Sequence, residues 1–172
     1  WVQSTGRGEY SISVPMFGVA RAALDQHPLI RHARPALKTL HEGTKQAVAL
    51  QVRVGLEAVC IERMDTEFTL TRGQSLGGRL PLNAGAAPRV LLAFSERRIQ
   101  RAWSSKYFQR GHAERVTDKT ITNVAELRRR IQVIRTRRYE ISDGDTVTDG
   151  ASIGVPIFNR AVQCIAAISL AG

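Results

Sequence analysis

The chain has 172 residues, of which 43% are hydrophobic and 23% charged, a size and balance that fit one globular domain with its own core. Its two cysteines, Cys60 and Cys164, lie far apart in apolar stretches, which predicts buried free thiols and excludes a disulfide framework. The sequence contains neither a run of about 18 apolar residues nor a signal peptide. We therefore expect a cytoplasmic protein without membrane contact.

The positive charge is concentrated in one segment. The formal net charge is +10, and between Arg97 and Arg138 there are 13 Lys and Arg residues against three acidic residues. The remainder has 12 residues of each sign. This basic segment could attract nucleic acid or another anionic partner, or it could be the solvated face of a helix.

The first third of the chain predicts a strand, two helices and a hairpin. Residues 9–14 alternate polar and apolar side chains, as in a strand, and Pro15 begins a helix. A second helix follows Pro28, where Pro35 kinks or divides it and Gly43 marks its end. The Val-rich stretches QAVALQVRV and LEAVCIERM form a hairpin around the glycine between them.

The middle of the chain predicts helices after a turn-rich stretch. Residues 65–81 contain three glycines, and AGAAPRVLLAF then forms a short apolar helix. Ser95 is expected to cap another helix, ERRIQRAW, and residues 104–120 are expected to be irregular.

The last third predicts a helix and three strands. Residues 121–138 carry an apolar stripe at helical spacing, with arginines on most other positions. The stripe is formed by Val124, Leu127, Ile131 and Ile134. This pattern favours an amphipathic helix packed on a sheet over a DNA-reading helix, since no helix-turn-helix joint is near. Three strands follow, and because hairpin joints dominate, the chain predicts an α/β fold with an antiparallel sheet.

A search for catalytic or metal-binding motifs finds no motif in its required structural context. The sequence contains no GxxxxGK[ST], HExxH or CxxC pattern. Residues 73–77, GQSLG, have the spacing of GxSxG, but they lie in the turn-rich stretch and do not open a helix, as a nucleophile elbow must. Asp143, Asp145 and Asp149 share a loop, but a calcium loop requires a closing Glu, which is absent here. We therefore predict no catalytic residues, no metal, no cofactor and no enzymatic activity.

One segment offers a binding site made of backbone. GGRLPLNAGAAPRVLLAF runs from a glycine pair into an apolar helix, whose first turn has unpaired N–H groups and a positive dipole end. The small residues Ala84, Gly85 and Ala86 would let an anionic ligand approach. Alternatively, Asn83 simply caps the helix and the small residues pack it on the sheet.

The same segment resembles a known signature. GGRLPLNAGAAPRVLLAF is similar to the "G…PL-h-A-A-GKALLAF" pattern of the IclR family of bacterial transcriptional regulators. TITNVAELRRRIQVIRTRRYEISDGDTVTDGASIGVPIFNRAVQCIAAISLAG resembles the closing helix, acidic loop and last strands of that family. WVQSTGRGEYSISV resembles the end of its wing and linker, and LIRHARPALKTLHEGTKQAVALQV resembles the segment that follows. The resemblance covers essentially the whole chain, in order.

This resemblance implies the C-terminal effector-binding domain of such a regulator. Residues 1–14 would be the end of a wing, a linker and a first strand, and residues 15–172 the effector-binding and oligomerisation domain. The fold implied is GAF-like or profilin-like, with a curved, mainly antiparallel sheet flanked by helices. A homodimer or homotetramer is implied, and so is an organic acid or aromatic effector. DNA would be bound by a winged-helix domain upstream of Trp1.

The resemblance also implies an effector site. Gly85 and Ala86 fall on amide donors at the helix start. The other implied site residues are Met64, Leu76, Leu82, Asn83, Asp143, Asp145, Ser152, Ile153 and Gly154. Three departures from the family pattern are Pro88-Arg89 in place of Gly-Lys, Arg138 in place of Gly, and Asn83 where His or Tyr is frequent.

Two other functions remain open at this stage. The domain could be an oligomerisation module with a degenerate pocket that binds no effector, which the departures at Asn83 and Pro88-Arg89 would favour. It could also bind nucleic acid through the basic segment, in which case binding would weaken steeply with salt.

Overall fold

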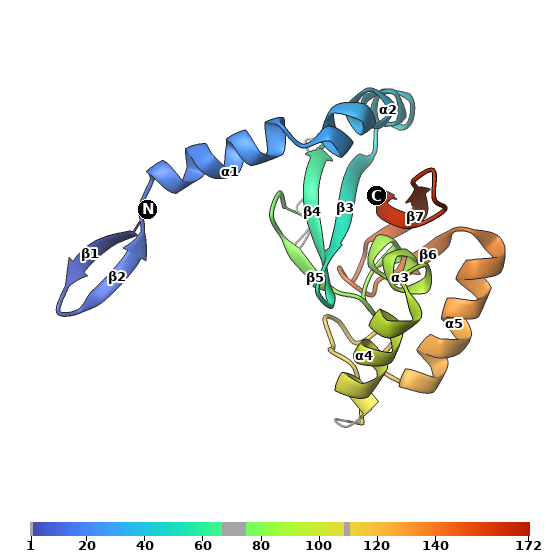
Figure 1. Cartoon of the computed structure of the whole chain (residues 1–172). Coiled ribbons are helices and arrows are strands. Elements are labelled where there is room, and N and C mark those ends of the chain that lie inside the picture. Colours follow the sequence, from blue (N-terminus) through green and yellow to red (C-terminus); the bar gives the residue numbers. More distant parts are fainter. Residues whose placement is uncertain (1, 67–74, 109–110) are drawn as a thin grey trace.

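The computed structural model describes residues 2–66, 75–108 and 111–172 (Figure 1). The chain begins with a hairpin of β1 (Val2–Gly6) and β2 (Glu9–Ile12), followed by α1 (Pro15–Asp25). None of the residues of α1 is buried, and the hairpin and α1 project away from the rest of the molecule (Figure 1). The strand expected within 9–14 and the helix expected at Pro15 are confirmed.

The main sheet has six strands. They are β3 (Ala47–Val54), β4 (Glu57–Met64), β5 (Arg79–Pro81), β6 (Glu140–Asp143), β7 (Ala151–Phe158) and β8 (Cys164–Ala171). Their order is β5-β4-β3-β8-β7-β6, and each neighbouring pair is antiparallel. Strand β8 therefore lies between β3 and β7, and it joins the β3–β4 hairpin to the pair formed by β6 and β7. This is the antiparallel α/β fold that the sequence predicts.

Helices cover both faces of the sheet. Side chains alternate between faces along a strand, so Ala166 of β8 packs on the side of α2 (Pro28–Thr44), while Ala167 packs on the side of α3 (Ala86–Ala93). The apolar stripe of α5 (Val124–Arg137) is buried in the same core as α3 and α4 (Arg97–Phe108). The short helix α3 is thus enclosed between the sheet and the two outer helices.

Four local predictions differ from the structure, two of them in α2. Helix α2 runs without a break through Pro35, which lies on its exposed side, and it ends at Thr44, with Lys45 in the left-handed conformation instead of Gly43. Helix α4 continues to Phe108, beyond the predicted end, because Trp103 and Tyr107 are four residues apart and both are buried. The Ser95 hydroxyl donates to the Leu91 carbonyl of α3, so it closes that helix and does not cap α4.

Both cysteines are expected to react slowly with thiol reagents in the folded protein. They are free, and burial raises the pKa of Cys60 and of Cys164 to about 11. Because the thiolate is the reactive form, only about one thiol in a thousand is reactive at pH 8. Reaction with an aromatic disulfide at pH 8 should be slow until denaturant is added, and should then consume two thiols per chain. Cys60 is buried as expected and Cys164 is only partly buried, and prompt reaction of the native protein would contradict both placements.

Candidate functional site

The connection between β5 and α3 places the start of α3 against β7. Gly85 is the N-cap residue, with a φ of +92° that strongly favours glycine. Gly154 of β7 lies under the first turn, where a Cβ would come within 2.7 Å of the Ala87 nitrogen. Two glycines therefore allow the helix to begin this close to the sheet. The N-cap is therefore Gly85 and not Asn83, whereas the small residues do pack the helix on the sheet, as the alternative to a ligand site expected.

The first amide of this turn already has an anionic partner within the protein. The Gly85 N–H donates to Oδ2 of Asp145 over 3.2 Å. Asp145 is buried in the loop after β6, where its other carboxylate oxygen accepts from the Ser142 hydroxyl and its carbonyl accepts from Thr120. The helix start therefore does bind a carboxylate, and the carboxylate belongs to this chain.

Arg89 connects this carboxylate to a second one. Its side chain is 2% exposed and forms an ion pair with Asp145. The guanidinium also donates to Oε1 of Glu140, with its Nε at 2.9 Å and its Nη2 at 2.8 Å. Arg130 of α5 holds the two oxygens of Glu140 at 2.8 and 2.9 Å. Two arginines and two carboxylates thus form an electrically balanced network, which is buried except for Arg130, whose side chain is 36% exposed.

Asn83 has a buried acceptor without a protein partner. Its Nδ2 donates to the carbonyl oxygens of Glu114 and Ile121 over 2.6 and 3.1 Å, which fixes the orientation of the amide. Its Oδ1 is buried and has no hydrogen-bond partner among the residues that the structure describes. Buried polar atoms normally have partners, so this oxygen offers a hydrogen-bond acceptor at the start of α3.

The structure brings together seven of the residues implied by the family resemblance. These lie around the start of α3 and the strands and loop beneath it: Leu82, Asn83, Gly85, Ala86, Asp145, Ser152 and Gly154. Ser152 of β7 lies close to Asp145 because it pairs in register with Ser142 of β6, and the Ser142 hydroxyl donates a hydrogen bond to Asp145.

The other four lie apart from this group. Met64 packs on the α2 side of the sheet, and Ile153 lies on the opposite face of β7 from Gly154 and is 40% exposed. Asp143 is exposed and pairs with Lys119 over 3.5 Å. Leu76 is 51% exposed and closely follows residues 67–74, which lie outside the described part of the chain.

Sequence reasoning missed the polar groups that matter most here. Arg89 is the one charged residue in an otherwise apolar helix, and that isolation is a signal of a buried, paired charge. Its partner Glu140 gave no comparable signal. Gln51 and Ser169 are also buried on the α3 side of the sheet, and Gln51 Nε2 and Ser169 Oγ have no partner among the described residues.

The described part of the chain shows no group of three or more side chains suited to hold a metal ion. Among the described helices, none is both long and apolar enough to cross a lipid bilayer.

The antiparallel sheet, the short enclosed helix α3 and the polar groups at the start of that helix define an α/β domain with a candidate binding site. The family model described as "Bacterial transcriptional regulator IclR C-terminal" matches residues 21–172, and the chain belongs to this family. Its relatives are transcriptional regulators, not enzymes.

Two relatives show how much of a regulator's length this chain covers. The chain is 30% identical to the HTH-type transcriptional regulator KipR of Bacillus subtilis, over 96% of this chain and 64% of the relative. It is 27% identical to the regulator KdgR of Dickeya chrysanthemi, over 99% of this chain and 55% of the relative. The chain therefore spans slightly more than half to just under two thirds of the length of these regulators.

Solved structures confirm the fold. The IclR protein of Thermotoga maritima has a TM-score of 0.82 at 23% identity, over 99% of this chain and 68% of that chain. The inducer-binding domain of PobR from Acinetobacter, a double mutant in complex with 3-hydroxybenzoic acid, has a TM-score of 0.73 at 27% identity. That likeness covers 83% of this chain and 81% of the PobR chain.

Proposed function

We propose that this domain senses a small organic acid with a hydrogen-bond donor, such as a hydroxylated aromatic acid, at the start of α3. The observation that carries the proposal is the buried Oδ1 of Asn83, which has no partner in the described protein and lies on the residue that precedes the Ala84-Gly85 turn. A ligand hydroxyl or N–H would satisfy it. PobR, a structural relative, is described with such an acid bound.

The ligand's carboxylate would compete with Asp145. That side chain now occupies the Gly85 amide and pairs with Arg89. An effector carboxylate at the same amide would displace Asp145 and with it the loop after β6. The loop after β6 would then have two arrangements, one with Asp145 at the Gly85 amide and one with the ligand there. Allosteric control of DNA binding requires two such states with different affinities for the ligand.

The proposal also assigns a role to residues 1–14 and includes self-association of the domain. The projecting hairpin and α1 would connect the domain to a DNA-binding unit, and the domain would act as a homodimer or homotetramer. Four apolar side chains in α1 and in the residue that precedes it are exposed, as expected of a surface that associates with a partner: Val14, Met16, Phe17 and Val19.

A thermal-shift titration with matched acids tests the sensing proposal. Binding at a hundredfold excess over Kd stabilises the fold by about 2.7 kcal/mol, which raises the Tm of a domain of this size by about 5–10 °C. We expect 3-hydroxybenzoate to raise the Tm and 3-methoxybenzoate, which lacks the donor, to raise it much less. Asn83→Ala should remove the difference between the two ligands.

A different result would favour the second candidate, an oligomerisation module with a closed pocket. The Gly85–Asp145 bond supports that candidate, since it leaves this amide occupied. No rise in Tm with a broad panel of organic acids, in a folded and oligomeric sample, would establish it over ligand sensing.

A further inference from the structure

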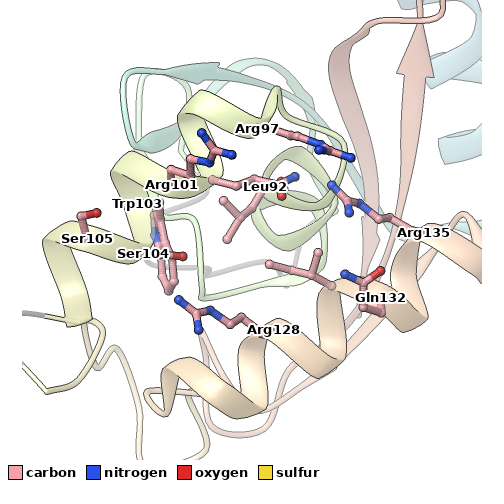
Figure 2. Close-up of a pocket in the computed structure, with 11 residues that line it drawn as sticks. Leu92, Arg97, Arg101, Trp103, Ser104, Ser105, Arg128, Gln132 and Arg135 are labelled. Atoms are coloured by element: carbon pink, nitrogen blue, oxygen red, sulfur yellow. The ribbon is translucent and has the colours of Figure 1, made fainter.

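A cleft lies between α4 and α5, at the opposite end of α3 from Gly85. Its volume is about 510 Å³, within the range of about 300–1,000 Å³ that small-molecule sites occupy. Figure 2 shows it with the side chains of α4 on one wall and those of α5 on the other. Leu92 of α3, Trp103 of α4 and Ile131 of α5 line it; each is less than 10% exposed, and most of the accessible lining of the cleft as a whole is apolar.

Four arginines converge on this cleft. Arg97 and Arg101 come from α4, and Arg128 and Arg135 come from α5 (Figure 2). Arg135 uses its Nε to donate to the Ala93 carbonyl over 2.7 Å, at the end of α3. No carboxylate within the described ranges forms an ion pair with any of the four.

Neighbouring arginines on the same helices are paired. Arg98 of α4 contacts Glu96 over 2.6 Å, and Arg130 of α5 contacts Glu140 over 2.8 Å. The acidic residues of this region are thus placed outside the cleft, and the unpaired positive charge is left inside it. Charges of one sign in a concave, partly apolar site concentrate the field and attract an anion of opposite sign.

The shape of the site selects the kind of anion. Duplex DNA is bound through several phosphate contacts spread along a face, whereas these guanidinium groups surround one cavity. The mostly apolar lining gives an organic ligand a surface to contact, which free phosphate cannot use. Guanidinium groups bind carboxylate and phosphate through paired hydrogen bonds.

We propose that the α4–α5 cleft binds an organic polyanion, a molecule with two or more carboxylate or phosphate groups on an apolar body. The acidic groups contact the arginines of the two walls, and the apolar body lies on the apolar lining between them. Because the cleft is at the end of α3 and Asn83 is before its start, this site is separate from the proposed effector site and does not depend on it.

Benzene-1,3,5-tricarboxylate is a suitable probe, and Trp103 is a built-in reporter. The sequence has two tryptophans, so a Trp1→Phe background leaves Trp103 as the only one. We expect a saturable change in fluorescence with this probe, and none with benzamide, a neutral aromatic amide. Arg128→Gln should weaken binding about tenfold or more, because it removes a charge-assisted contact.

Arg129→Gln is the matched control. Arg129 is the next residue of α5, is exposed as Arg128 is, and does not line the cleft. The two variants carry the same change in net charge, and both should fold because both side chains are on the surface. Arg129→Gln should leave the affinity unchanged within about twofold, which would establish a site instead of general attraction to a basic protein.

Four results would overturn the proposal. One is the absence of a saturable change up to about 10 mM probe, since a site with a Kd of about 1 mM would by then be mostly filled. A second is equal weakening by Arg128→Gln and Arg129→Gln. A third is binding that Asn83→Ala abolishes and Arg128→Gln does not, which would place the probe at the start of α3 and support the effector proposal alone. The fourth is Arg128-dependent binding of a short DNA duplex without any binding of the probe.

Discussion

Replacing Arg89 with methionine is expected to lower the free energy of unfolding by about 3–5 kcal/mol, the usual effect of removing one partner from a buried ion pair. Arg89 is 2% exposed and is bound to both Asp145 and Glu140. Arg130 would still neutralise Glu140, but the Asp145 carboxylate would be left in the core without a cation. Urea unfolding followed by circular dichroism measures the change.

Two further variants test the reason for this effect. Arg137→Met, at an exposed position of α5, should change stability by no more than about 0.5 kcal/mol. Arg89→Lys keeps the charge but has one ammonium group in place of the planar fork that reaches both carboxylates, and we expect a loss between the other two. Equal stability of Arg89→Met and Arg137→Met would show that the network is not formed.

Gly154→Ala is expected to be the second most damaging substitution. The new Cβ would lie 2.7 Å from the Ala87 nitrogen and 2.8 Å from the Ala86 carbonyl carbon. Because both atoms belong to the backbone, no side-chain rotation relieves the contact, and α3 must move away from β7. Such overpacking lowers the free energy of unfolding by about 1–3 kcal/mol. The shift of α3 should also weaken the binding of any ligand at the start of that helix.

The same substitution elsewhere provides the control. Gly43 lies in helix α2, where an added Cβ would have no other residue's atoms within 4 Å beyond its immediate helical surroundings, so Gly43→Ala should stabilise the protein by about 0.5–1 kcal/mol. Opposite signs for the two Gly→Ala changes, measured by urea unfolding, would confirm the close contact of α3 with β7. A neutral Gly154→Ala would show that α3 does not lie this close to the strand.

The helix α3 illustrates what can be predicted from sequence. Its apolar run, with small residues at the start, predicts a buried helix near residues 84–94, and the structure places it at Ala86–Ala93. Local patterns also predict the hairpin of β3 and β4 and the stripe of α5, because side-chain periodicity depends on neighbours along the chain.

The polar network could not be predicted in the same way. Arg89 contacts Glu140, which is 51 residues later, and Asp145, which is 56 residues later, and no periodic pattern connects such positions. The Gly85 amide was expected to be available to a ligand, whereas its partner is a carboxylate from a distant loop. Similarly, the arginines between Arg97 and Arg138 predicted a charged helix face, but only the packing of α4 against α5 shows that four of them share one cleft.

Effector binding at the start of α3, as proposed here for this domain, would be visible in a crystal structure of the complex. The crystals would contain the organic acid that raises the Tm most in the screen. We expect a ligand donor within about 3 Å of Oδ1 of Asn83, the usual hydrogen-bond distance, and Asp145 displaced from the Gly85 amide. A ligand bound elsewhere, with the Gly85–Asp145 bond intact, would contradict it.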